Sequence, residues 1–200
     1  MRFHKEGYTS LALVLLFFFI VSAFAHYYEA GSLFKGLIYI LFGMLFLVVL
    51  YFFRSPTRII KQDPSQIYAP SDGTIASIDE IVDENNLEHS LFKISITISA
   101  LNVRLTRAPI SGTAFTNSLE FHGKFRQSIK SNNEIDVVVE HDGNFWKGPV
   151  FYNQKMVNQG DVIGSIKFGS SVDLYFPATA VLVAKKGDTI RAGETMLAKI

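Results

Sequence analysis

The chain has no cysteine among its 200 residues. A disulfide scaffold, a thiol nucleophile and a cysteine-ligated metal site are therefore excluded. It also has no excess of basic residues, because 19 Lys and Arg stand against 18 Asp and Glu. A protein that neutralises nucleic-acid phosphates needs such an excess, so we expect no nucleic-acid partner.

Familiar catalytic signatures are missing as well. The sequence contains no GxGxxG, P-loop or HExxH pattern. Its histidines are scattered along the chain: His4, His26, His89, His122 and His141. Because a metal site needs several ligands at matched spacing, we expect none here.

Charge is scarce in one part of the chain. Residues 1–53 hold only five charged side chains but ten of the 18 Phe. They contain two long uncharged runs, residues 7–28 and 36–53, each close to the roughly 20 residues that cross a bilayer. The second run has 13 Leu, Ile, Phe or Val, which favours insertion by about 6 kcal/mol. We predict a membrane anchor over 1–53, with transmembrane helices at about 8–28 and 36–53.

The charges that flank this hairpin predict its orientation. Basic residues precede the first run and follow the second: Arg2, Lys5, Arg54, Arg58 and Lys61. The positive-inside rule therefore puts both ends in the cytoplasm, with the following domain on the cytoplasmic side of the cell (inner) membrane. Ala23-Phe24-Ala25 also fits a signal-peptide cleavage site, so cleavage of the first run stays open as an alternative.

The remainder of the chain has the pattern of a β domain, which we predict over 67–200 after a linker at 54–66. Residues 91–98 (LFKISITI) alternate apolar and polar without a break, as in a half-buried strand. We expect the other short strands at 74–81, 136–140, 165–168, 171–176 and 180–184. Residues 83–89 read as a polar loop and 117–133 as irregular, and no convincing helix longer than two turns follows residue 60.

A weak internal repeat supports a compact all-β fold. Gln159-Gly160-Asp161 resembles Lys186-Gly187-Asp188, and both precede a short apolar stretch. Such a turn needs Gly for positive φ and an Asp that accepts a hydrogen bond from nearby backbone. Two generic hairpin turns would look the same. Turns of this kind recur in lipoyl-like, barrel-sandwich domains, so the predicted fold class is an all-β domain of that type with an N-terminal transmembrane α-hairpin.

One segment suggests a function. Residues 166–177 (IKFGSSVDLYFP) place Gly169-Ser170-Ser171 between two short apolar strands. This stretch resembles the FGSxVD(L/V)xxP signature of phosphatidylserine decarboxylase proenzymes, in their short, archaeal-type branch. Residues 52–56 (FFRSP) and 69–75 (APSDGTI) resemble the family's anchor junction and AP(A/S)DG segment. Further matches, in the family's order, are NVRLTRAPISG at 102–112 and HGKF at 122–125.

The resemblance implies an enzyme that matures by cutting itself. The Ser170 hydroxyl would attack the Gly169 carbonyl, and elimination would then leave an N-terminal pyruvoyl group derived from Ser170. Asp72 would be the acidic residue that assists processing. The mature enzyme would use this covalent pyruvoyl cofactor to decarboxylate phosphatidylserine in the membrane to phosphatidylethanolamine. The resemblance further implies that the two cleaved chains stay associated, and it leaves open a homo-oligomer.

The sequence departs from the family pattern at three places. Arg104 stands where the family has His after Asn-Val, and arginine stays protonated, so it is no general base. Ser171 replaces a usual Arg, and the stretch between Glu140 and Gly160 is shorter than expected. Asp72 could then act directly, or His122 could take the missing role.

Two other functions remain compatible with the sequence. A degenerate relative could keep the fold and anchor without cleaving, and act as a membrane-tethered module that binds lipid or a partner. An unrelated membrane-tethered β-sandwich adaptor would share the composition but not the ordered motifs. A cut between Gly169 and Ser170 separates the enzyme from both.

Overall fold

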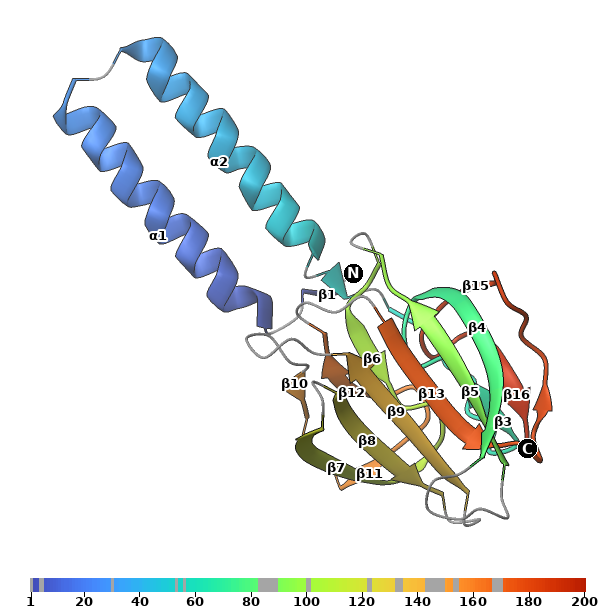
Figure 1. Cartoon of the computed structure of the whole chain (residues 1–200). Helices are drawn as coiled ribbons and strands as arrows, with labels where there is room; N and C mark the ends of the chain where they lie inside the picture. Colours follow the sequence, from blue (N-terminus) through green and yellow to red (C-terminus); the bar gives the residue numbers. More distant parts are fainter. Residues whose placement is uncertain are drawn as a thin grey trace. The chain divides into compact units, whose positions relative to one another are not determined.

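A computed structural model gives the fold of the chain (Figure 1). It describes all residues except 1, 4–5, 30, 53, 56, 83–89, 100–101, 122–123, 132–134, 143–149, 153–154 and 167–170. Two compact units follow one another along the sequence, Met1–Thr57 and Arg58–Ile200.

The first unit is a helical hairpin. Helix α1 spans Glu6–Tyr27 and helix α2 spans Ser32–Phe52, and a short pairing of β1 (Arg2–Phe3) with β2 (Arg54–Ser55) joins the ends. Helix α2 begins four residues before the uncharged run, since Lys35 is helical rather than part of the loop. The helices meet through tilted ring contacts, with Phe18 and Phe42 centroids 5.2 Å apart.

The outer surface of the hairpin is apolar. Both helices are long and apolar enough to cross a membrane, and only 6% and 11% of the two spans are buried. A core helix of a soluble protein would be mostly covered, whereas Phe19 is 70% exposed and Leu33 86%. The predicted helical hairpin is therefore confirmed as helices, and its surface suits a lipid environment.

The second unit is the predicted all-β domain. Its largest sheet has the strand order β11-β7-β8-β9-β13-β5-β4-β15, and every neighbouring pair is antiparallel. The bounds of these strands, in chain order, are β4 Gly73–Val82, β5 Ser90–Thr97, β7 Gly112–Phe121, β8 Lys124–Lys130, β9 Asp136–Asp142, β11 Met156–Val157, β13 Ser171–Pro177 and β15 Thr189–Ile190.

Two smaller sheets form the opposite layer. One has the order β10-β12-β6 and the other β14-β16-β3. Their strands are β3 Gln66–Tyr68, β6 Leu105–Arg107, β10 Val150–Phe151, β12 Val162–Ser165, β14 Val181–Leu182 and β16 Met196–Lys199. Backbone hydrogen bonds connect the two sheets, since the Arg107 amide donates to the Pro70 carbonyl at 2.8 Å and the Tyr68 amide donates to the Pro109 carbonyl at 3.1 Å.

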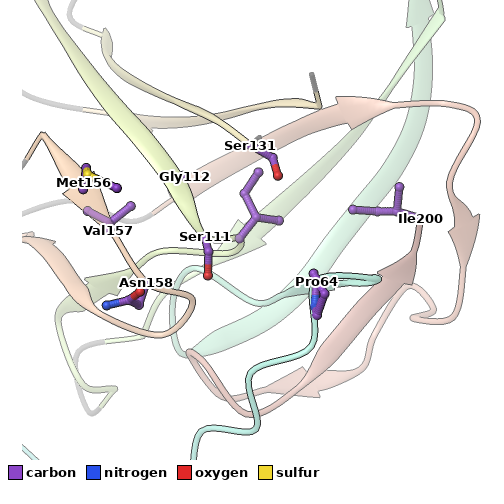
Figure 2. A pocket seen from close by; sticks show the side chains of 9 residues that line it. Pro64, Ser111, Gly112, Ser131, Met156, Val157, Asn158 and Ile200 are labelled. Atoms are coloured by element: carbon purple, nitrogen blue, oxygen red, sulfur yellow. The ribbon is translucent and has the colours of Figure 1, made fainter. Parts of the chain in front are cut away.

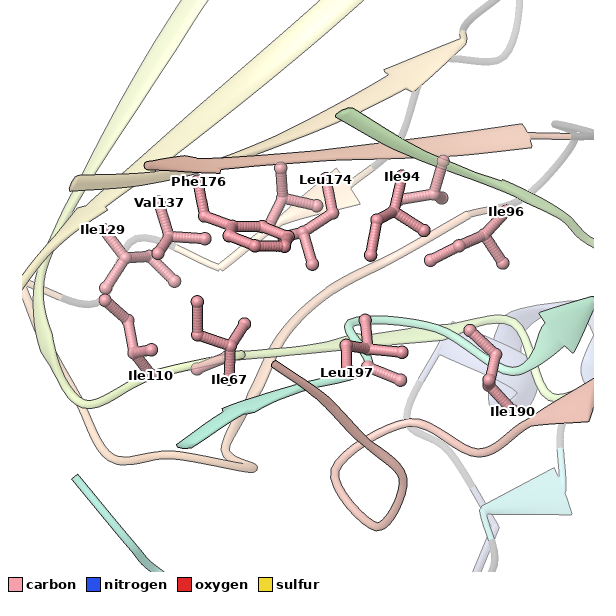
Figure 3. Packing of buried hydrophobic residues seen from close by; sticks show 14 of the residues in the cluster. Ile67, Ile94, Ile96, Ile110, Ile129, Val137, Leu174, Phe176, Ile190 and Leu197 are labelled. Atoms are coloured by element: carbon pink, nitrogen blue, oxygen red, sulfur yellow. The ribbon is translucent and has the colours of Figure 1, made fainter. Parts of the chain in front are cut away.

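The core lies between these layers (Figure 3). The large sheet contributes one set of side chains, among them Ile94, Ile96, Leu174 and Phe176. The opposite layer contributes another, among them Ile67, Ile110 and Leu197. Alternate residues of β13 are buried, because successive side chains of a strand point to opposite faces.

The Gly-Asp turns have the predicted geometry. Gly160 has φ +86° and Gly187 has φ +91°. The carboxylates of Asp161 and Asp188 each accept a hydrogen bond, at 2.8 Å, from the backbone amide three residues earlier. The two turns of the repeat therefore share the same local geometry, a glycine with positive φ and an Asp carboxylate that accepts a backbone hydrogen bond.

Three sequence-based expectations were wrong in detail. Residues 117–133 are not irregular, because β7 and β8 form a hairpin within and around them. The expected strand at 165–168 is displaced, since β12 ends at Ser165, and the strand at 180–184 shortens to β14. The predicted loop at 83–89 and residues 167–168 lie outside the described part of the chain.

Candidate functional site

The segments that carry the sequence resemblance meet at one end of the sandwich. The chain crosses there from β3 to β4 through residues 69–72 and from β12 to β13 through residues 166–170. Thr74 of β4 pairs with Thr97 of β5, which in turn pairs with Ser171. The AP(A/S)DG-like turn therefore lies two strands from the first residue of β13, about 10 Å at ordinary strand spacing.

The other neighbours of β13 bring in the remaining segments. Val172 pairs with His141 of β9, and His141 pairs with Phe125 of the HGKF-like turn. On the opposite layer, the Ile166 amide donates to the Arg104 carbonyl at 2.9 Å. Three segments far apart in sequence, those around Thr74, Phe125 and Arg104, thus lie near the first residues of β13 or beside Ile166.

The predicted reactive bond itself lies outside the described residues, as does His122. The bond joins Gly169 to Ser170, and Ser170 is bonded to Ser171, the first residue of β13. Phe121 and Lys124, on either side of His122 and Gly123, pair with each other at the tip of the β7–β8 hairpin.

Asp72 is described and is held by two donors. Its Oδ2 atom lies 2.6 Å from Arg58 Nη2, and its Oδ1 accepts a hydrogen bond from the Ala192 amide at 2.8 Å. Arg58 also reaches Glu194, with Nη1 3.3 Å from Oε2. Both oxygens of the Asp72 carboxylate are therefore engaged, and its orientation is fixed.

A second arginine lies in the same charged group. Arg107 is buried and donates from Nη1 to the Gly160 carbonyl at 2.7 Å. Burial lowers the pKa of Arg107 and the positive charge of Arg58 lowers it further, while Asp72, Glu194 and Asp161 act in the opposite direction. Two cations and two carboxylates, Asp72 and Glu194, thus form a balanced cluster at the start of β4.

His141 is a residue that the sequence analysis did not single out. Its side chain is fully buried, and burial lowers the pKa of its imidazole to about 4, although the negative charge of Glu140 acts in the opposite direction. It is therefore neutral at pH 7, and burial disfavours its protonated form. The signal was present, because His141 continues the alternation of Val137 and Val139 onto the core face.

Buried hydroxyls gather at the same end. Ser71, Thr106 and Ser165 have side-chain oxygens with no hydrogen-bond partner among the described residues. Thr106 pairs in register with Gly164, next to Ser165, and Ser71 follows the Pro70 carbonyl that accepts from β6. An unpartnered buried hydroxyl costs about 1–3 kcal/mol, so three at one place are unusual for a purely structural region.

A pocket of about 410 Å³ lies elsewhere in the domain (Figure 2). It opens where β7 starts and β8 ends, and it is lined by Pro64, Ile110, Ser111, Gly112, Ser131, Met156, Val157, Asn158 and Ile200. Lys130 and Lys124 mark opposite ends of β8, so this pocket is at the far end of the strand from His141. Within the described residues, no group of three His, Asp or Glu side chains could hold a metal ion.

Comparisons with known proteins agree with the sequence resemblance. A family model described as phosphatidylserine decarboxylase matches residues 45–145 and 114–198. A phosphatidylserine decarboxylase proenzyme of Cytophaga hutchinsonii is 32% identical over 219 residues, covering 100% of this chain and 99% of the relative. The proenzyme of Ehrlichia ruminantium strain Welgevonden is 30% identical, covering 98% and 89%. That of Pelobacter propionicus is 34% identical, covering 86% and 87%.

Proposed function

Because the chain belongs to the phosphatidylserine decarboxylase family, we propose that it decarboxylates phosphatidylserine to phosphatidylethanolamine. The apolar helices α1 and α2 would anchor it in the cell membrane, with the β domain on the cytoplasmic side. The headgroup of the lipid lies at the membrane interface, so an anchored enzyme need not extract its substrate into water.

The observation that carries this proposal is the convergence around β13. Residues 69–75, 102–112, 122–125 and 166–177 are separate in sequence, yet their described parts adjoin one end of the sandwich. A scaffold that kept only the fold would have no reason to hold these segments together with unpaired buried hydroxyls. The arrangement fits a reaction centre at the Gly169–Ser170 bond, which precedes β13 in the chain by one residue.

Maturation would proceed in three balanced steps. The Ser170 oxygen attacks the Gly169 carbonyl carbon, the amide C–N bond breaks, and the nitrogen takes the proton, which gives an ester. Removal of the Ser170 α-proton then breaks the Cβ–O bond and releases a chain that ends at the Gly169 carboxylate. Water replaces the nitrogen of the remaining dehydroalanine, ammonia leaves, and a pyruvoyl group stays at the new N-terminus.

The pyruvoyl group supplies a ketone that binds the substrate amine and serves as the electron sink while CO2 leaves. Ser71, Thr106 and Ser165 fit such a centre, because their free hydroxyls can donate to a developing oxyanion. The backbone carbonyl of Arg104 accepts the Ile166 amide, so this residue adjoins the same segment.

The two products of the cut would remain one folded unit. The piece that begins at residue 170 contains β13 to β16, and β13 pairs with β5 along its whole length, from Ser171 to Pro177. The other edge of β13 pairs with β9 from Val172 to Tyr175. A strand held on both edges does not leave its sheet without unfolding the domain.

Two described residues are candidates for the general base in processing. Asp72 is our proposed processing residue, and its carboxylate is fixed by Arg58 and Ala192. His141, opposite Val172, is the one described imidazole next to β13 and is neutral at pH 7. We propose that Asp72 assists processing; His141 is a second candidate for accepting the Ser170 proton by its position, although its lowered pKa makes it a weak base.

A non-cleaving homologue is the second candidate function, favoured by Arg104 in place of the family histidine. Arg104→His tests it directly in the full-length chain. If the wild type stays uncut and this variant cleaves, the missing imidazole is the defect and the natural chain is the tethered binding module. If the wild type already cleaves, Arg104 is compatible with maturation.

The enzymatic proposal is tested with vesicles that contain phosphatidylserine. We expect the purified full-length protein to convert it to phosphatidylethanolamine with release of CO2. Ser170→Ala, which has no hydroxyl to attack or eliminate, should form no product and serves as the matched control. Equal, negligible turnover by both proteins would contradict the proposal.

A further inference from the structure

The segment that joins the hairpin to the β domain is docked along the domain. The Ile59 amide donates to Glu194 Oε1 at 3.1 Å, and the Asp63 amide donates to Gln159 Oε1 at 2.8 Å. Between them, Ile60 packs so closely on the Gly160 turn that a Cβ at that glycine would meet Ile60 Cδ1 at 2.6 Å. We name residues 58–63 the juxtamembrane strap.

Arg58 makes the strap's strongest contact. Its side chain is only 9% exposed, and its two terminal nitrogens reach two different carboxylates, Asp72 at 2.6 Å and Glu194 at 3.3 Å. Only a guanidinium can serve two acceptors in this forked geometry, because an ammonium is a single point charge. Arg58 therefore sets the distance between Asp72 and Glu194.

Without Arg58 the local charge would be unbalanced. Asp72 and Glu194 would then share Arg107 as the nearby buried cation, and Arg107 already donates to the Gly160 carbonyl. Two partly buried carboxylates with one cation repel each other, so Asp72 would lose one of its two fixed donors and turn toward solvent. The Ala192 amide would remain as its single anchor.

We propose that Arg58 is the positioning residue for Asp72 in maturation, so that cleavage requires the juxtamembrane strap to be docked. This inference rests on the proposed function, in which Asp72 assists processing. It makes the segment adjoining the membrane anchor part of the processing machinery. Displacing an assisting group by about 1 Å can slow a reaction by about 100-fold.

The test compares variants of the full-length chain synthesised without cells in the presence of lipid. The rate at which fragments 1–169 and 170–200 appear is followed by gel and intact mass. We expect Arg58→Gln to slow cleavage about 30-fold and Arg58→Lys to slow it about 5-fold, in that order. Arg191→Gln is the matched control, because Arg191 is exposed and lies 4.0 Å from Glu194 without an ion pair to Asp72. It should cleave within about twofold of wild type.

A second readout separates positioning from folding. Turnover of phosphatidylserine per cleaved chain should stay within about twofold of wild type in Arg58→Lys, because the strap acts before the cofactor exists. A general folding defect would lower turnover and melting temperature together. If Arg58→Gln does not fold, Arg58→Lys still tests the inference. Slower cleavage with unchanged turnover of phosphatidylserine in that variant is the expected result.

The inference would be overturned if Arg58→Gln or Arg58→Lys were cleaved at the wild-type rate or faster. It would also be overturned if Arg191→Gln slowed cleavage as much as the Arg58 variants do. Loss of phosphatidylserine turnover in parallel with cleavage in Arg58→Lys would overturn it as well. An uncut wild type instead contradicts the proposed function, and the inference falls with it. Whether the wild-type protein is cleaved therefore distinguishes failure of the proposed function from failure of this inference.

Discussion

The two ends of the β sandwich differ in what they bury. The end where β13 begins encloses polar groups: the His141 imidazole, the hydroxyls of Ser71 and Thr106, and the Asp72–Arg58 ion pair. The other end has a pocket of about 410 Å³ beside Ser131, lined by apolar and small polar residues with no charged side chain. The described pocket and the buried polar groups are thus at opposite ends of the domain.

We name the end where β13 begins the motif end. The Ser71 and Thr106 hydroxyls are buried there without partners among the described residues, which is unfavourable, and a domain that only had to fold would place apolar side chains at these positions. Such strain is concentrated at functional sites in many proteins. The comparison predicts large effects at the motif end and small ones at the pocket.

The largest effect should come from Asp72→Asn. The variant keeps the shape but removes the negative charge, so we expect cleavage to slow by about 1,000-fold, as for loss of an assisting acid or base. Time courses of fragment formation measure it. Glu80→Gln is the control, since Glu80 is an exposed carboxylate near the other end of β4. Similar rates in Asp72→Asn and wild type would remove Asp72 from the mechanism.

His141 should make the domain less stable in acid. Its pKa falls from 6.5 to about 4 on folding, so the folded state binds fewer protons than the unfolded state between those values. The contribution of His141 to the free energy of unfolding is fully present above about pH 6.5. It is lost as the pH falls toward 4, by about 3 kcal/mol in total. Urea unfolding at pH 7 and pH 5 measures the loss.

A variant identifies the group responsible. His141→Gln should remove most of this pH dependence between 7 and 5. Glu140 contributes at lower pH: burial raises the pKa of its carboxyl, but hydrogen bonds and charge from Lys124 and Arg126 outweigh this and lower it overall. Stability from that carboxylate is present above its unfolded pKa and lost below. An unchanged pH slope in His141→Gln would refute the assignment.

Thr106→Val should separate stability from function. The variant removes a buried hydroxyl that has no partner among the described residues, so we expect the domain to be unchanged or stabilised by about 1 kcal/mol. Cleavage should slow by about tenfold if that hydroxyl donates to the oxyanion. Destabilisation by more than about 1 kcal/mol would show that the hydroxyl is a structural donor.

The smallest effect should come from the pocket. Ser131→Leu adds apolar volume there, beside Ile200, without touching the motif end. We expect cleavage and phosphatidylserine turnover within about twofold of wild type. A loss of turnover with normal cleavage would instead make this pocket a part of the substrate site.

The sequence predicted the elements whose pattern is local. Ile94 and Ile96 of β5 are buried as the alternation required, and the glycines at 160 and 187 have positive φ. The β7–β8 hairpin was missed because polar and apolar residues there do not follow the usual burial pattern of a strand. The polar Gln127 is buried, and the apolar Phe115 is exposed. Burial of a polar residue under a sheet depends on the opposite layer, which no local pattern reports.

The site was predictable only in part. Asp72 and Ser170 came from ordered motifs, whereas Arg58 looked like a basic flank of the membrane anchor. Its partner Glu194 is 136 residues away in sequence, and only the fold brings the two together. Contacts between distant strands carry no sequence periodicity, so such a residue is found from the structure.

The intact mass of the purified wild-type protein shows whether the bond between Gly169 and Ser170 is cut. We predict two chains, residues 1–169 and 170–200, with an N-terminal carbonyl on the smaller chain that borohydride reduces. Ser170→Ala should remain a single chain of 22.4 kDa. A wild-type protein that stays one uncut chain after prolonged incubation with lipid would contradict the account.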